Sequence, residues 1–272
     1  MSASMRFALF CTALFAWAAT AAAQSLPTSQ PNMLLINIER IKLGHGVPHR
    51  ITESGWPAAY ERAKSPNSYI ALEALTGPPE AWFISPFESN AAIGNSFKME
   101  GEDRALSAEL ARLAQADAEH LDALRTIHAM GRKDLSHGAF PDAGKQRFYE
   151  ITTFRVRPGG EAAFEAAAKA YGAAAGKAAP NTAYRVYEVV AGLPGPTYLV
   201  FSSTASFGEF DKYASDLMAT MKAMTPQEQE AMQKFNEFLT EAVTQRFRLA
   251  PDMSYVSRAV RETDPGFWLS KN

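Results

Sequence analysis

Residues 40–50, RIKLGHGVPHR, and 69–77, YIALEALTG, belong to a stretch that occurs a second time in the chain. Residues 40–77 align without a gap on residues 155–192, which begin RVRPGGEAAFE and end YRVYEVVAG. Identical residues fill 8 of the 38 paired positions, among them Arg40 and Arg155, Gly44 and Gly159, Tyr69 and Tyr184, Glu73 and Glu188, and Gly77 and Gly192. The halves are therefore diverged duplicates, and the duplication decides the architecture.

The first copy predicts a mixed order of strands and helices. Residues 33–42 alternate apolar and polar side chains as a strand does, and a helical stretch follows at about 49–64, where Pro57 must kink the helix or begin a fresh turn. Two β-rich runs, 69–75 and 81–85, flank a turn with glycine and proline and predict a hairpin. A leucine stripe that includes Leu121 and Leu124 predicts a helix, and residues 126–131 supply a last strand.

The second copy repeats this order. A helix is expected at 160–177 and a hairpin at 184–190 and 197–202. Thr225, Pro226 and Glu228 form the pattern of a capping box at the start of a helix whose apolar stripe runs on to Ala242 and Val243, and residues 244–249 follow as a strand. Each half thus reads β-α-β-β-α-β, so we predict an α+β protein of two tandem ferredoxin-like units.

The flanking segments divide the rest of the chain. We predict a signal peptide at 1–23, a mobile linker at 24–32, the first unit at 33–137, a linker at 138–146, the second unit at 147–256 and a docked tail at 257–272. Arg6 precedes an apolar run that ends in alanines before Gln24, and the only cysteine, Cys11, lies inside it. We therefore expect a periplasmic or secreted protein without thiol chemistry; an uncleaved N-terminal anchor is the alternative.

Composition excludes several classes of protein. With 47% apolar residues and a net charge of −2, the chain can bury a core and is not basic enough to suggest nucleic acid as a partner. After cleavage no stretch is long and apolar enough for a stable membrane span. A homodimer is left open.

In the order of its elements and in its duplication, the chain over about residues 33–256 resembles the dimeric α+β barrel superfamily. Members include antibiotic-biosynthesis monooxygenases, NIPSNAP-like proteins and the haem-binding chlorite dismutase group. The resemblance implies that two ferredoxin-like sheets face each other in a barrel, here between the halves of one chain. Pairing the bare faces of two such sheets buries both.

Eight side chains are the candidate ligand-binding residues, because we place them on the barrel side of their strands. This expectation assumes that Ile36 and Ile151 pack on the helices, so that the alternate residues point inward. The candidates are Asn37, Glu39, Tyr69, Glu73, Glu150, Thr152, Tyr184 and Glu188. Glu73 and Glu188 are duplicates that could share a proton, bind a cation or act as a general base. Alternatively, they could form structural ion pairs with Arg40 and Arg155 or face solvent at an edge.

The sequence predicts no metal site and no cofactor. His45 and His49 are four residues apart, but Gly44, Gly46 and Pro48 favour a surface loop over a zinc helix. The chlorite dismutase resemblance implies a proximal histidine in the second half, and all five histidines lie in the first. Phosphate loops and nucleophile motifs are missing as well.

Three functions stay open, and the sequence does not decide whether the protein is an enzyme. The first is a carrier of a small apolar or aromatic ligand held between the repeats. The second is a cofactor-independent monooxygenase-like enzyme, and the third is a protein-interaction module. An open, lined pocket would favour the first two, and a barrel filled by side chains would favour the third.

Overall fold

The computed structural model describes residues 26–269, and its two repeats have matching elements. The signal peptide predicted at 1–23 lies outside the described residues. The first repeat contains β1 (Met33–Ile41), α1 (Gly46–Glu53), α2 (Gly55–Ala63), β2 (Ile70–Ala74), β3 (Glu80–Phe87), α3 (Asn90–Glu102), α4 (Arg104–Asp117) and β4 (Leu121–Gly131). The second contains β5 (Phe148–Val156), α5 (Glu161–Ala178), β6 (Arg185–Ala191), β7 (Thr197–Thr204), α6 (Phe210–Lys222), α7 (Pro226–Phe238) and β8 (Leu239–Leu249).

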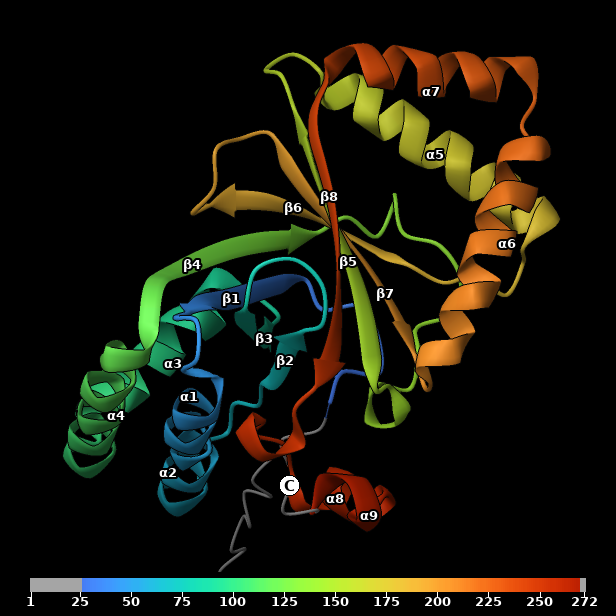
Figure 1. Cartoon of the computed structure of the whole chain (residues 1–272). Coiled ribbons are helices and arrows are strands. Elements are labelled where there is room, and N and C mark those ends of the chain that lie inside the picture. Colours follow the sequence, from blue (N-terminus) through green and yellow to red (C-terminus); the bar gives the residue numbers. More distant parts are fainter. Residues whose placement is uncertain (1–25, 270–272) are drawn as a thin grey trace, which may run out of the picture.

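The eight strands form one closed antiparallel barrel in the order β1-β3-β2-β8-β5-β7-β6-β4. Each repeat supplies four neighbouring strands, and the pairs β2–β8 and β4–β6 join the repeats. Helices α1–α4 and α5–α7 lie on opposite sides of the strands (Figure 1). The predicted α+β fold with facing sheets from the two halves is confirmed. Closure leaves no free sheet edge within the barrel.

The barrel interior is the main hydrophobic core. It contains side chains from all eight strands, including the fully buried Ile36, Leu72, Leu199 and Phe247. Trp82 and Phe247 meet there with ring centroids 5.2 Å apart. Each strand turns its other face toward the helices of its own repeat, where a second core forms around Phe164 in one repeat and a third around Phe83 in the other.

Repeated glycines hold equivalent turns. Gly44 and Gly159 have φ of +84° and +88°, and Gly77 and Gly192 have φ of +83° and +93°, a region that only glycine adopts readily. A Cβ atom on Gly192 would also lie 2.2 Å from the Thr126 carbonyl oxygen. The positive φ, and at Gly192 the nearby carbonyl oxygen as well, explain why glycine occupies these positions in both repeats.

Two local predictions about helices are confirmed. Thr225 accepts a hydrogen bond from the Glu228 amide while Glu228 bonds back to the Thr225 amide, which completes the capping box of α7. In the first repeat, α1 ends at Glu53 and α2 begins at Gly55, so Pro57 falls in the first turn of a new helix. Amides of a first turn have no intrahelical partner, and proline is tolerated there.

The last strand of each repeat is longer than predicted. Leu121, Leu124, Ala242 and Val243 were expected in helices but belong to β4 and β8, where Leu124 pairs with Glu39 and Ala242 with Phe154. Leu124 remains 61% exposed and Val243 40% exposed. The apolar spacing was wrongly interpreted as the buried stripe of a helix. Backbone pairing with β1 and β5, rather than a buried apolar face, holds these parts of β4 and β8.

The segments that flank the repeats pack on the barrel. Residues 26–32 were expected to be a mobile linker, yet Leu26 is buried in the interior core and Gln30 donates a hydrogen bond of 3.0 Å to the Val186 carbonyl. In the tail, α8 (Arg258–Thr263) and α9 (Pro265–Trp268) bring Trp268 into the same core, as predicted for a docked tail. No helix among residues 26–269 is long and apolar enough to cross a membrane.

Candidate functional site

A cleft opens between the outer face of the second-repeat sheet and helices α5, α6 and α7. Its volume is about 550 Å³. Small-molecule sites in proteins measure roughly 300–1,000 Å³. The cleft therefore has room for a ligand of the size of one to three fused rings.

Aromatic and other apolar side chains make up most of the cleft lining. Phe154 comes from β5, Phe164 from α5 and Phe235 from α7, and their ring centroids lie 5.7–6.0 Å apart. The lining further includes Tyr171, Tyr184, Val186, Val200, Tyr213, Leu217, Met221 and Met232. Such a surface favours an apolar or aromatic ligand.

Polar side chains line part of the cleft and are mostly satisfied by one another. Arg246 donates to Glu150 at 2.8 Å, and its guanidinium carbon lies 4.3 Å from the Phe210 ring centroid. Thr152 and Thr244 share a hydrogen bond of 2.9 Å across β5 and β8. These groups would orient a ligand's polar edge rather than hold a strongly charged molecule.

Tyr184 offers a hydroxyl group with no hydrogen-bond partner among the described residues. The residue is 7% exposed, and burial raises the pKa of its phenol, so the hydroxyl keeps its proton at neutral pH. Its ring lies 5.7 Å from that of Tyr171 and 5.9 Å from that of His137. A buried donor without a partner at the edge of a cleft is suited to a ligand oxygen.

The placement of the candidate residues inside the barrel was wrong. Ile36 and Ile151 point into the interior core, so Asn37, Glu39, Tyr69, Glu73, Glu150, Thr152, Tyr184 and Glu188 face outward, toward the helices. The interior is screened from water on all sides, whereas the helices cover the outer face only in part. The more apolar face of each strand is therefore the inner one.

The structure brings three of the eight candidates together at the cleft. These are Glu150, Thr152 and Tyr184. Asn37 of the first repeat, which aligns with Thr152, accepts a hydrogen bond of 2.7 Å from Thr126. Whether any of them binds a ligand stays a prediction.

Side chains fill most of the barrel interior. A cavity of about 120 Å³ remains at one end, near Leu26, Tyr149 and Tyr187. A water molecule occupies about 30 Å³ of liquid, so this cavity has room for a few waters and not for a drug-sized ligand. A drug-sized ligand between the facing sheets therefore has no room there.

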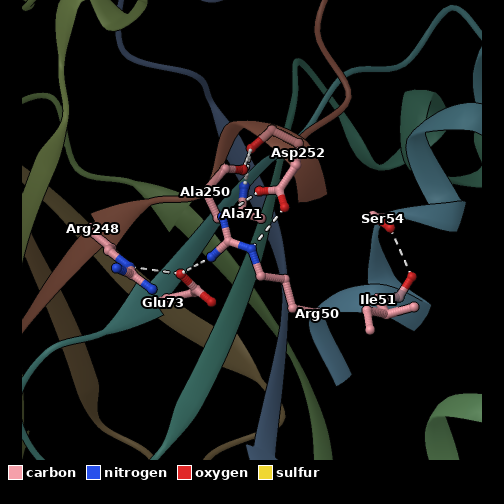
Figure 2. Close-up of polar contacts among 9 residues, drawn as sticks. Arg50, Ile51, Ser54, Ala71, Glu73, Arg248, Ala250 and Asp252 are labelled. Carbon is pink, nitrogen blue, oxygen red and sulfur yellow. Dashed lines mark hydrogen bonds and ion pairs between the residues drawn. The ribbon is translucent and has the colours of Figure 1, made fainter. Parts of the chain in front are cut away.

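Glu73 and Glu188 form ion pairs, but not with the arginines expected. Figure 2 shows Glu73 between Arg50, at 2.7 Å, and Arg248, at 2.8 Å, while Arg50 also binds Asp252 through two bonds of 2.7 and 2.8 Å. Arg40 instead contacts Glu80 at 3.3 Å. The partners come from α1, β8 and the segment after β8, which are distant in sequence from the strand of Glu73.

Glu188 lies in an equivalent network built around a different arginine. Arg132, just after β4, contacts Glu188 at 3.1 Å, Glu165 at 2.8 Å and Asp134 at 2.8 Å. Arg155 forms none of these bonds. Both networks join the end of one repeat to the other repeat, at the strand pairs that close the barrel. We therefore interpret Glu73 and Glu188 as members of structural ion-pair networks.

The cleft does not fit a histidine-ligated haem. Its lining contains no histidine, and His137, although it packs beside Tyr184, is not part of that lining. Among residues 26–269 one group of four side chains could hold a metal ion, but it lies in the first repeat, away from this cleft.

Sequence reasoning missed cleft residues on strands, such as Phe154 and Arg246, and others on helices. Tyr213 and Met221 on α6 and Met232 on α7 complete the cleft opposite the sheet. Their spacing on amphipathic helices is the pattern of any core-facing helix, so it contains no separate signal of a ligand.

Comparison with known proteins supports the fold. No protein-family model matches the sequence, and no curated protein matches it. A structure from Lactobacillus acidophilus, provisionally called a monooxygenase, has a TM-score of 0.51 at 9% identity, covering 84% of this chain and 97% of its own. The structure of an anthrone oxidase-like protein has a TM-score of 0.51 at 13% sequence identity, and the match covers 83% of this chain and 94% of that protein. A mutant chlorite dismutase from Candidatus Nitrospira defluvii has a TM-score of 0.50 at 12% sequence identity, and the match covers 88% of this chain and 97% of that protein. The fold is thus that of the dimeric α+β barrels.

Proposed function

We propose that the second-repeat cleft binds a small aromatic or otherwise apolar ligand, and that the protein acts on this ligand as a monooxygenase-like enzyme. The observation behind the proposal is the aromatic cleft of about 550 Å³ with the unpartnered hydroxyl of Tyr184. The names of two similar structures, a monooxygenase and an anthrone oxidase-like protein, favour an oxidation over simple carriage.

An activated aromatic substrate can be oxidised by O₂ without a reductant. When a methylene group between aromatic rings becomes a ketone, the substrate supplies all four electrons, one oxygen atom stays in the product and the other leaves as water. The protein's part would be to hold the rings, exclude water and stabilise charge on the substrate oxygen. Tyr184, whose hydroxyl has no hydrogen-bond partner among the described residues and keeps its proton, would donate its O–H to that oxygen.

Narrowing the cleft should abolish both binding and turnover. Ala214 is an exposed residue of α6 that lines the cleft, so Ala214→Trp should reduce O₂ uptake at least about ten-fold by displacing ligand. The measurement is an oxygen-electrode assay with anthrones, quinols and polyphenols in EDTA, without added flavin. Fluorescence of 1-anilinonaphthalene-8-sulfonate reports occupancy independently of turnover.

Ala219→Trp is the matched control, because Ala219 is also exposed on α6 but does not line the cleft. A second pair separates catalysis from binding: Tyr184→Phe should slow oxidation about 100-fold, as the loss of an oxyanion donor does, while Tyr149→Phe in the barrel interior should not. Uptake no faster than the uncatalysed reaction across the panel would refute the enzyme. Equal probe fluorescence in both tryptophan variants would refute the cleft as the binding site.

An interaction module is the second candidate, since the barrel interior is filled. The cleft favours the ligand-binding proposal over it, because an interaction surface does not require a lined hollow between sheet and helices. If both cleft assays fail, the interaction module becomes the better proposal.

Export is part of the proposal and rests on the sequence of residues 1–23. Signal peptidases cleave after small residues, so the mature chain should begin at Gln24. N-terminal sequencing of the protein from a periplasmic fraction measures this. A chain that keeps Arg6 and stays with the membrane fraction would instead indicate an uncleaved anchor.

A further inference from the structure

Four ionisable side chains meet in the first repeat, between the sheet and helices α1 and α4. Glu39 projects from β1, His49 and Glu53 lie one turn apart on α1, and Asp117 is the last residue of α4. Their exposed fractions are 9%, 1%, 3% and 2%. One ligand atom from each lies within 4.8 Å of the others. His49, expected in a surface loop, is instead a buried residue of a helix.

His49 is the one basic side chain among the described residues that contacts these carboxyl groups. His49 Nε2 lies 2.9 Å from Glu39 Oε2 and 4.0 Å from Asp117 Oδ1. No lysine or arginine of residues 26–269 forms an ion pair with the four. Glu53 Oε1 and Asp117 Oδ1 are buried without a hydrogen-bond partner in the described chain. Buried charges normally have partners or bind metal ions.

The second repeat shows that the fold does not require polar residues at these positions. Equivalent residues are offset by 115 in β1 and β5 and in α1 and α5, and by 118 in β4 and β8. At the positions of Glu39, His49, Glu53 and Asp117 the second repeat has Phe154, Phe164, Ala168 and Phe235. Those three phenylalanines pack against one another along the wall of the cleft. The same sheet and helices thus accept an apolar cluster.

Buried ion groups are often no more stable than apolar residues of similar volume. The first repeat nevertheless keeps three carboxyl groups and a histidine where its duplicate has apolar side chains. Stability of the fold gives no reason to keep them, and a bound cation does. Two oxygens with no hydrogen-bond partner among the described residues, one on α1 and one on α4, offer donor atoms for such a cation.

We propose that Glu39, His49, Glu53 and Asp117 bind one divalent transition-metal ion, Mn²⁺, Fe²⁺ or Zn²⁺. One imidazole nitrogen and three carboxylate oxygens form a donor set that these ions accept, whereas Mg²⁺ and Ca²⁺ prefer oxygen alone. Ligand atoms about 2.1 Å from one tetrahedral ion are about 3.4 Å apart. The present spread of up to 4.8 Å therefore needs to contract by about 1 Å on binding.

Tyr69 would support this site from the second sphere. Its hydroxyl is buried and has no hydrogen-bond partner among the described residues. Burial is the largest cause that raises the pKa of its phenol, and the Glu53 carboxylate raises it further. A hydrogen bond from such a hydroxyl to a ligand carboxylate is the usual outer-sphere contact of a metal site.

The test measures metal content and thermal stability of the full mature chain, purified without a histidine tag and stripped with EDTA. On adding Zn²⁺, Mn²⁺ or anaerobic Fe²⁺, wild type should retain one equivalent after desalting and show a raised melting temperature. His49→Phe and Glu53→Ala should weaken binding more than about 100-fold. These variants carry the residues of the second repeat and are expected to fold, which far-UV circular dichroism checks.

Glu109→Gln is the matched control, because Glu109 is a carboxylate of the same helix α4 whose bonds are to Arg62 and Arg112. It should bind metal as wild type does. Retention of less than about a tenth of an equivalent by wild type, or equal retention by wild type and His49→Phe, would overturn the proposal. Ala214→Trp should not change metal binding, so failure of the cleft and failure of this site are distinguishable.

Discussion

Raising the pH from 5 to 9 in EDTA is expected to destabilise the protein by roughly 3–5 kcal/mol through the buried carboxyl of Glu53. Burial, with the neighbouring charges of Glu39 and Asp117, raises the pKa of Glu53 to about 10. Burial and Glu39 also raise the pKa of Asp117 to about 6. In an unfolded chain both carboxyls titrate near pH 4.

The direction follows from the protons bound in each state. Between about pH 4.5 and 10 the native protein holds a proton on Glu53 that the unfolded chain has released. The native state binds more protons, so the free energy of unfolding falls as the pH rises. The full stability is present below about pH 4.5 and is lost as the pH approaches 10.

Chemical denaturation at a series of pH values measures this slope. Glu53→Gln is the control, because an amide cannot ionise, and its free energy of unfolding should vary less with pH than that of wild type by the amount assigned to Glu53. Parallel curves for wild type and Glu53→Gln would show that the carboxyl titrates normally in the native protein.

Replacing Arg132 by alanine is expected to lower the free energy of unfolding by about 2–3 kcal/mol. The Arg132 side chain is 16% exposed and contacts three carboxylates, those of Asp134, Glu165 and Glu188. Those contacts raise the pKa of its guanidinium. Removing the cation leaves three like charges together at the junction of β4 and β6, and the partial exposure of the carboxylates limits the loss.

Arg40→Ala is the comparison, since Arg40 is 53% exposed in its side chain and contacts one carboxylate. Its loss should be under about 1 kcal/mol. Urea unfolding of both variants at neutral pH measures the difference, and Arg132→Ala combined with Glu188→Gln should regain part of the lost stability. Equal losses in Arg132→Ala and Arg40→Ala would show that the network contributes no more than a surface pair.

Much of the fold could be predicted because local sequence patterns specify its turns and helix ends. The repeated glycines require positive φ, the capping box begins α7, and the hairpin turns are marked by glycine and proline. Predictions failed where a pattern fits two structures: apolar spacing around Leu124 and Val243 is compatible with a helix and with an exposed strand.

The sites were harder to predict, since their members meet only through the packing of distant elements. Asp117 reaches His49 because α4 lies against α1. One feature of the sequence distinguishes the four residues of the proposed metal site: each aligns with an apolar residue of the other half. That comparison identifies polar side chains at positions where the fold accepts a core.

Sequence alone determined the duplication and the α+β order of elements in the two units, because periodicity and turn chemistry are local properties of the chain. The barrel itself was expected from the resemblance to the dimeric α+β barrels. Tertiary structure decided which strand face is the interior. It turned Glu39 and Tyr184 toward the helices and paired Glu73 with Arg50 instead of Arg40. Alternation along a strand defines two faces, but only the closure of the barrel determines which of them is screened from water on all sides.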